Sequence, residues 1–419
     1  MNRRSFLTAG LLLPFMGGVL LPYGSGSWVA RAATPDDNRK RLIVVFLRGA
    51  VDGLNVVVPY GDDRYYDNRR SIAVKNPGKD NGALDLDRHF GLHPALASVM
   101  PLWQKGELAF VHASGSPDPT RSHFDAQLFM ENGTPGRAAN PDGWMNRLLG
   151  VMPGVKTPSS AIAFGPQIPR ILSGPQTVAN LSNANDIGRQ LPIDKPGVSE
   201  AFAKLYGGND ALSRTYQDSQ QSRQQMQMAD AAGDDKEQMA ANAGAPLPNG
   251  FPTDAARLAH MMRQDPTIRL AFFQLGGWDT HINQGAGEGQ LANRLKPLGE
   301  GLAALAKGLG PVYKDSLIVV MSEFGRTVHE NGNGGTDHGH GNVMWLLGGE
   351  VAGGKVYGNW PGLATDQLYQ QRDLAVTTDF RTILGPTVIR HLRLPDTQIA
   401  TLFPDLPANG TAFSSVLRA

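Results

Sequence analysis

Five short runs of apolar residues constrain the fold of this chain more than any other feature of its sequence. They lie at residues 42–47, 108–111, 270–275, 317–321 and 343–347. Their nearly continuous hydrophobicity is typical of parallel strands buried on both faces. Between them, residues 94–104, 254–263 and 291–309 repeat apolar positions at helical spacing. The alternation predicts an α/β fold, a doubly wound and mostly parallel sheet with helices on both faces.

The N-terminus predicts an exported protein. Arg3 and Arg4 precede an apolar run that is short for a membrane span, which is the pattern of a signal peptide. The order Arg3-Arg4-Ser5-Phe6-Leu7 fits a twin-arginine signal over residues 1–32, with cleavage before Ala33. We therefore expect passage through the Tat translocase, a periplasmic or extracellular location, and no stable membrane span after signal removal. An uncleaved signal that acts as an anchor is the alternative.

The amino-acid composition limits which catalytic groups, metal ligands and partners this chain can have. The 419 residues include no cysteine, which excludes disulfides, thiolate catalysis and cysteine-ligated metals. Any metal must therefore be held by oxygen and imidazole ligands. The net charge is +1 and no basic cluster follows the leader, so a nucleic-acid partner is not expected.

The mature chain, residues 33–419, is expected to form one α/β domain with an insertion at about 207–250. The insertion contains a Gln-rich segment followed by Ala, Gly, Asp and Pro, without a convincing strand. A solvated helix and loop is one interpretation, and a lid that controls substrate entry is the other.

Ligand sites in open α/β sheets lie beyond the carboxyl ends of the strands, so the residues after each apolar run are candidates. Asp52 follows the first run in a glycine-flanked turn. The second run is followed by a segment rich in hydroxyls, which includes Ser122 and ends in the motif RSHFDAQ. A hydroxyl here could be a nucleophile or could cap the helix that begins near Phe124.

The third and fourth runs are followed by carboxylates and histidines. GGWDTH carries Asp279 and His281, and SEFGRT carries Glu323 and Arg326. A glycine-rich segment then carries Asp337, His338 and His340. Flexible backbone lets closely spaced imidazoles converge, and histidine with carboxylate suits Zn, Mn and related divalent ions. The alternative for each segment is a solvent-exposed loop.

The sequence resembles the family called domain of unknown function 1501. The resemblance is carried by FLRGAVDGLNVVVP, RSHFDAQ, GGWDTH, SEFGRT and DHGHG, which occur in that order over essentially the whole mature chain. That family is in turn similar to the alkaline-phosphatase and sulfatase superfamily, whose members hold one or two divalent metals on a doubly wound sheet.

The superfamily resemblance implies two sets of metal ligands. One ion would be held by Asp52, Glu323 and His338, and the other by Asp279, His281 and His340. The spacing of Asp279 and His281 is shorter than in the superfamily, and Phe324 stands where the superfamily has a histidine, which His338 would replace. The ion or ions would be Zn, Mn, Ca or Mg.

The same resemblance implies a hydroxyl nucleophile, for which Ser122 is the choice, and a charged residue that neutralises the transferred anion, Arg121 or Arg326. Pro117 occupies the position of the sulfatase Cys or Ser that becomes formylglycine, which excludes that mechanism. We therefore expect an exported metal-dependent hydrolase of phosphate or sulfate esters, acting on a small anionic ester or a polymer. The alternative is a non-catalytic metal-binding protein of the same fold that binds a polymer or a protein partner.

Overall fold

The computed structural model describes residues 39–137, 142–154, 156–181, 240–406 and 416–418. The predicted signal peptide lies outside the described residues. Residues 207–239 of the predicted insertion also lie outside the described residues, so the prediction of a lid stays a prediction. None of the helices in the described ranges combines the length and the hydropathy that a membrane crossing requires.

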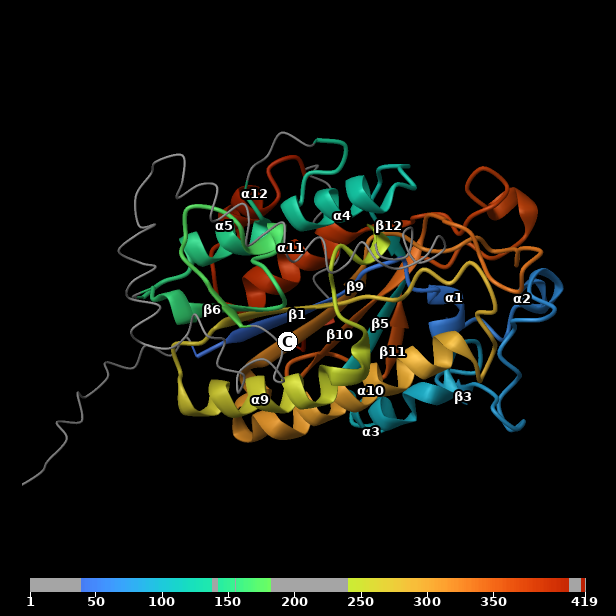
Figure 1. Cartoon of the computed structure of the whole chain (residues 1–419), viewed down its shortest axis with the longest axis horizontal. Helices are drawn as coiled ribbons and strands as arrows, with labels where there is room; N and C mark the ends of the chain where they lie inside the picture. The colour runs from blue at the N-terminus through green and yellow to red at the C-terminus, as the bar shows by residue number, and fades with distance from the viewer. Residues whose placement is uncertain (1–38, 138–141, 155, 182–239, 407–415, 419) are drawn as a thin grey trace, which may run out of the picture. The chain divides into compact units, whose positions relative to one another are not determined.

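A nine-stranded sheet forms the centre of the fold (Figure 1). Its strands lie in the order β11-β5-β10-β9-β1-β8-β6-β7, and β12 pairs with β5. The bounds are β1 Arg41–Leu47, β5 Leu108–Gly115, β6 Ala161–Phe164, β7 Ala179–Leu181, β8 Leu270–Leu275, β9 Ser316–Ser322, β10 Asn342–Gly348, β11 Lys355–Tyr357 and β12 Thr378–Asp379. All five predicted runs are strands of this sheet, and the predicted fold class is confirmed.

The direction of β10 differs from the prediction. This strand pairs antiparallel with both β5 and β9, whereas β1 pairs parallel with β8 and β9. The chain leaves β9 and returns through β10 without a crossover helix, so the connecting loop stays at one edge of the sheet. Buried hydrophobicity alone does not distinguish the two directions, because both bury the strand equally.

Helices cover both faces of the sheet (Figure 1). The α-helices are α1 Gly53–Val56, α2 Asp63–Asn68, α3 Met100–Gln104, α4 His123–Asn132, α5 Trp144–Val151, α9 Phe251–Gln264, α10 Gln290–Leu309, α11 Phe380–His391 and α12 Ile399–Leu402. The 3-10 helices are η2 Pro94–Val99, η3 Pro158–Ser160, η4 Arg170–Leu172, η6 Pro248–Gly250, η7 Gly310–Asp315, η8 Thr365–Gln367 and η9 Asp396–Gln398. The predicted helix at 94–104 is thus divided into η2 and α3.

The strand β1 shows why its sequence is continuously apolar. Ile43, Val45 and Leu47 pack in the core that includes α9 and α10, whereas Val44 and Phe46 pack in the core that includes α5 and α11. Burial of each such side chain stabilises the fold by about 1.5–3 kcal/mol before the entropic cost is counted. Packing on both faces therefore contributes to the stability of the sheet.

A small second sheet is formed by the segment of the chain between β1 and β5. It has the order β2-β4-β3, with β2 Val57–Val58, β3 Leu84–Asp85 and β4 Gly91–Leu92, all antiparallel. It packs the segment after Asp52 against the domain, since Val57 and Leu92 belong to the same core as α10.

Candidate metal centre

The predicted site segments meet at one edge of the sheet because of the strand register. Leu47 at the end of β1 lies opposite both Leu275 of β8 and Ser322 of β9. Asn342 at the start of the reversed strand β10 lies opposite Ser114 near the end of β5. The loops after β1, β5, β8 and β9 therefore begin at the same level.

Three imidazoles converge at this edge. The Nε2 atom of His338 lies 3.0 Å from Nε2 of His123 and 3.1 Å from Nε2 of His281. The Asp279 carboxylate faces the same point, with Oδ1 3.0 Å from His281 Nε2 and 3.4 Å from His338 Nε2. Ligand atoms of His123, Asp279 and His338 all lie within 4.8 Å of one another. Three predicted site residues are thus brought together with His123.

Each of the three histidines is held by its other ring nitrogen. Nδ1 of His123 lies 2.8 Å from Oε1 of Glu323, and Nδ1 of His281 lies 3.2 Å from Oδ1 of Asp337. Nδ1 of His338 lies 2.9 Å from the carbonyl oxygen of Arg121. A proton donated from each Nδ1 leaves a lone pair on each Nε2, directed toward the other two rings.

This donor set fits a divalent ion. Lone pairs that face one another at about 3 Å repel unless a proton or a cation lies between them. Two imidazole nitrogens bound tetrahedrally to one Zn²⁺, each at roughly 2.0–2.1 Å, are about 3.3 Å apart, close to the separations found here. Acceptors on the outer nitrogens are the usual support of metal-binding histidines.

The local charges agree with this arrangement. Burial would raise the pKa of the Asp279 carboxyl, but His123, His281, His338 and Arg326 hold that pKa well below its usual range. Burial opposes protonation of His123, yet hydrogen bonds to Asp279 and Glu323 raise the pKa of His123 to about 9. In the absence of an ion the cluster therefore retains protons that an ion would displace.

Two glycines let the backbone of the glycine-rich segment approach its neighbours. A Cβ at Gly335 would lie 2.2 Å from the carbonyl oxygen of His281, and one at Gly339 would lie 2.4 Å from the carbonyl carbon of Arg326. These are separations that side chains do not tolerate, so glycine is required at both positions for His338 to reach the cluster.

Arg326 is buried against the cluster. Its Nη1 lies 2.8 Å from Oδ1 of Asp279, and the residue is 1% exposed. Among the described residues, Nε and Nη2 of Arg326 have no hydrogen-bond partner. The charge of the guanidinium is therefore directed to Asp279, and its role in neutralising a transferred anion stays a prediction.

The carboxylates of Asp52 and Glu323 face other protein groups rather than the point where the three Nε2 atoms converge. Asp52 is fully buried and accepts two hydrogen bonds from Arg69, at 2.5 and 3.0 Å, and one from Gln284 at 2.7 Å. Glu323 accepts from Gly49 N at 2.8 Å as well as contacting His123. Asp52 thus neutralises a guanidinium, and Glu323 supports a histidine.

His340 and the predicted catalytic residues lie around the centre rather than in it. The His340 ring packs on Tyr369 with ring centroids 4.5 Å apart. The Ser122 hydroxyl accepts from Asp125 N at 3.4 Å as the N-cap of α4. The Arg121 guanidinium donates to the buried Asp373 at 2.6 Å, and only the carbonyl of Arg121 reaches His338. None of these side chains has a described contact with Asp279.

Sequence reasoning missed His123 as a candidate ligand. It lies in RSHFDAQ beside the hydroxyls that drew attention, and it is the first residue of α4. The signal that could have identified it is its place at a strand-to-helix junction on the edge that carries the other ligands.

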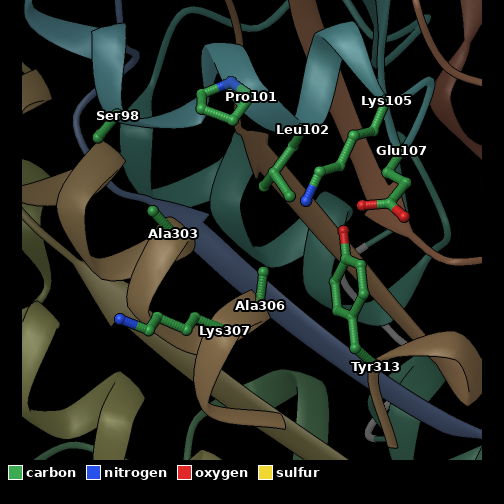
Figure 2. Close-up of a pocket in the computed structure, with 9 residues that line it drawn as sticks. All are labelled: Ser98, Pro101, Leu102, Lys105, Glu107, Ala303, Ala306, Lys307 and Tyr313. Atoms are coloured by element: carbon green, nitrogen blue, oxygen red, sulfur yellow. The ribbon is translucent and has the colours of Figure 1, made fainter. Parts of the chain in front are cut away.

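Two of the cavities in the described part of the chain are relevant here. One of about 310 Å³ lies between α3 and α10, where Figure 2 shows Lys105, Glu107 and Tyr313 on one side and Ala303 and Ala306 on the other. None of its lining residues is a predicted site residue. The other, of about 290 Å³, is here called the α4 cavity, and it is lined by Arg48, Phe124, Gln127, Leu128, Glu131, Gln167, Ile168, Pro169, Arg170, Ala240, Ala243 and Gln274.

Comparison with known proteins places the chain in a family. The family model described as "Protein of unknown function (DUF1501)" matches residues 39–403. The chain belongs to this family. No curated protein sequence matches the chain.

Solved structures similar to this DUF1501 protein share little sequence with it. The C-terminal periplasmic domain of EcEptC from Escherichia coli, in complex with Zn, is 10% identical, with 74% of this chain and 73% of that chain covered and a TM-score of 0.34. A protein in the alkaline phosphatase superfamily from Vibrio parahaemolyticus is 10% identical, with 76% and 62% covered and a TM-score of 0.36. The lipoteichoic acid synthase LtaP from Listeria monocytogenes is 11% identical, with 85% and 73% covered and a TM-score of 0.33. The function must therefore be argued from the residues of this chain.

Proposed function

We propose that this protein is an exported, metal-dependent hydrolase of phosphate or sulfate esters that works with one divalent ion. The observation that supports this proposal is the convergence of three Nε2 atoms and one carboxylate, with every Nδ1 occupied by an acceptor. The ligands would be His123, His281, His338 and Asp279. Two ions would require Asp52 and His340, whose side chains make other contacts.

The exposure of the ligands indicates how a substrate would approach. The side chains of His281 and His338 are 31% and 19% exposed, whereas those of His123 and Asp279 are 9% and 2% exposed. An ester would therefore reach the centre from the side of His281 and His338. A divalent ion bound there would supply Lewis-acid activation of an ester oxygen.

The protein's own residues would keep the ligands in place. Glu323 and Asp337 orient the rings of His123 and His281 by accepting their Nδ1 protons. Arg326 fixes the Asp279 carboxylate from the buried side. Attack by Ser122 would require its hydroxyl to leave Asp125 N.

A non-catalytic metal-binding protein that binds a polymer or a protein partner is the second candidate. The observation that favours it is the pairing of both predicted anion-binding arginines. Arg121 donates to Asp373, and Arg326 lies against Asp279. Each guanidinium thus already faces a carboxylate of the protein.

Export is proposed on the sequence of the leader. Residues 1–32 fit a twin-arginine signal. Proteins carried by that pathway fold before export, so the ion would be acquired in the cytoplasm and the working location would be the periplasm or the extracellular space.

Metal analysis of the purified mature protein, paired with hydrolysis assays on aryl phosphates and aryl sulfates, tests the proposal. We expect about one divalent ion per chain, lost in His281→Ala and retained in His260→Ala, which changes an exposed histidine of α9. Hydrolysis should follow the ion content. Absence of an ion in the wild type would reject both candidates, and an ion without hydrolysis of either ester would leave the binding protein.

A further inference from the structure

Four large hydrophobic side chains are exposed in the described part of the chain, and two of them directly follow histidines of the metal centre. They are Phe124 at 80%, Leu247 at 49%, Ile282 at 48% and Ile168 at 45% exposed. Phe124 directly follows His123, and Ile282 directly follows His281. Exposed aromatic surface beside a site of polar ligands points to an apolar partner.

Phe124 and Ile168 line the same depression, the α4 cavity. Phe124 and Leu128 are four residues apart and so lie on one face of α4. Pro169 adds apolar surface to the same lining. The walls thus present apolar groups from two segments that are distant in sequence.

The polar floor of the α4 cavity is already satisfied by its own contacts. Arg48 donates to Gln274 at 2.9 Å and to Gln127 at 2.6 Å, and it forms an ion pair with Glu131 at 2.8 Å. Glu131 also accepts from Ile171 N. Because these four polar groups bond to one another, an occupant that contacts Phe124, Leu128 and Ile168 gains chiefly from apolar contact.

The α4 cavity is connected to the metal centre through one side chain. Gln127 lines the cavity, and its Nε2 donates to Oε1 of Glu323 at 2.9 Å. The same Oε1 is the partner of His123 Nδ1. Cavity and centre therefore share the first turns of α4.

We infer that the α4 cavity takes an apolar ring of the substrate, so that the preferred esters are those of hydrophobic, aromatic alcohols. This inference rests on the proposed function. The ring would contact Phe124 and Ile168 while the anionic group faces His281 and His338. Esters of small polar alcohols would lack this contact and would bind less tightly.

Calorimetric titration of the metal-loaded mature protein with naphthylmethylphosphonate and with methylphosphonate tests the inference. We expect the naphthyl compound to bind roughly tenfold or more tightly, from the apolar area it buries. Phe124→Ser should abolish that difference without disturbing the core, because the side chain is 80% exposed. Leu247→Ser, an exposed change outside the α4 cavity, should preserve it.

Equal affinity of the two phosphonates, or an advantage that persists in Phe124→Ser, would overturn the inference. If neither phosphonate binds, the proposed anion chemistry is wrong, and uncharged naphthalenemethanol then decides about the cavity. Binding of this alcohol that is lost in Phe124→Ser supports an apolar site. No binding of the alcohol to the wild type rejects it.

Discussion

Two buried aspartates at the same edge of the sheet each face a buried arginine, yet their surroundings differ. Asp52 lies with Arg69, and Asp279 lies with Arg326. In the first pair the guanidinium also donates to Asn55 and to the carbonyls of Val328 and Thr327. Every polar group of that cluster therefore has a partner within the fold.

The second pair is open by comparison. Among the described residues, Arg326 Nε and Nη2 lack hydrogen-bond partners, and three imidazole nitrogens face the Asp279 carboxylate. A cluster with all donors matched to acceptors stabilises a structure, whereas one with converging lone pairs has capacity for a cation. The two clusters therefore predict different responses to substitution.

The largest effect is expected at the closed pair. Asp52→Asn removes the charge that compensates the buried Arg69, and breaking such a pair costs about 3–5 kcal/mol of unfolding free energy. Denaturant unfolding of the metal-free protein measures it. Asp63→Ala, an exposed change, is the control. Loss of metal with unchanged stability would instead make Asp52 a ligand and remove the contrast.

The second largest effect, a loss of metal affinity, is expected in the open cluster around Asp279. Glu323→Gln removes the charge that faces His123 Nδ1 and leaves a weaker amide acceptor in its place, and weakening such a supporting partner lowers metal affinity about 10–100-fold. Competition with a chelator measures the affinity. Asp337→Asn, the matched change beside His281, should cost less because that carboxylate is 56% exposed. The opposite order would contradict this account of the centre.

The stability of the metal-free protein should depend on pH through His123, which belongs to the open cluster. The pKa of His123 is raised to about 9 in the metal-free fold, above the unfolded value of about 6.5. Protonated His123 therefore stabilises the metal-free protein below about pH 6.5, and this stability is lost as pH rises through about 9.

Metal binding displaces those protons and strengthens over the same range. The difference in melting temperature between loaded and metal-free protein should thus widen from about pH 6.5 to 9. A difference that stays constant in a thermal series would show that His123 carries no proton to displace.

The smallest effect is expected at His340. Its ring packs on Tyr369 and not on the cluster, so His340→Ala should leave the ion content unchanged. Elemental analysis of the variant beside His338→Ala measures this. Equal loss of metal in both variants would indicate that His340 is a metal ligand, as the sequence predicted.

The strands were predictable because burial on both faces leaves a local signature. Ile43 and Val44 face opposite cores, so their run is apolar throughout. The direction of β10 was not predictable, since it depends on pairing with β5 and β9. The short strand β6, Ala161–Phe164, was missed because four residues are too few for a period to show.

The site was partly predictable for a related reason. Asp279, His281 and His338 follow strand ends, and chain topology brings strand ends together. Asp52 does so too, but its partner Arg69 lies 17 residues later, and sequence does not reveal which cation a carboxylate faces. His123 begins a helix, where a neighbouring Ser122 offered a more familiar role.

The proposed ligands follow β5, β8 and β9 along the chain, and β10, β9 and β1 lie between β5 and β8 in the sheet. An ion held by His123, His281 and His338 would therefore act as a clasp across five neighbouring strands. It would join segments that lie 57 to 215 residues apart along the chain, and it could bind only after the sheet has formed. Occupancy would then report that folding is complete.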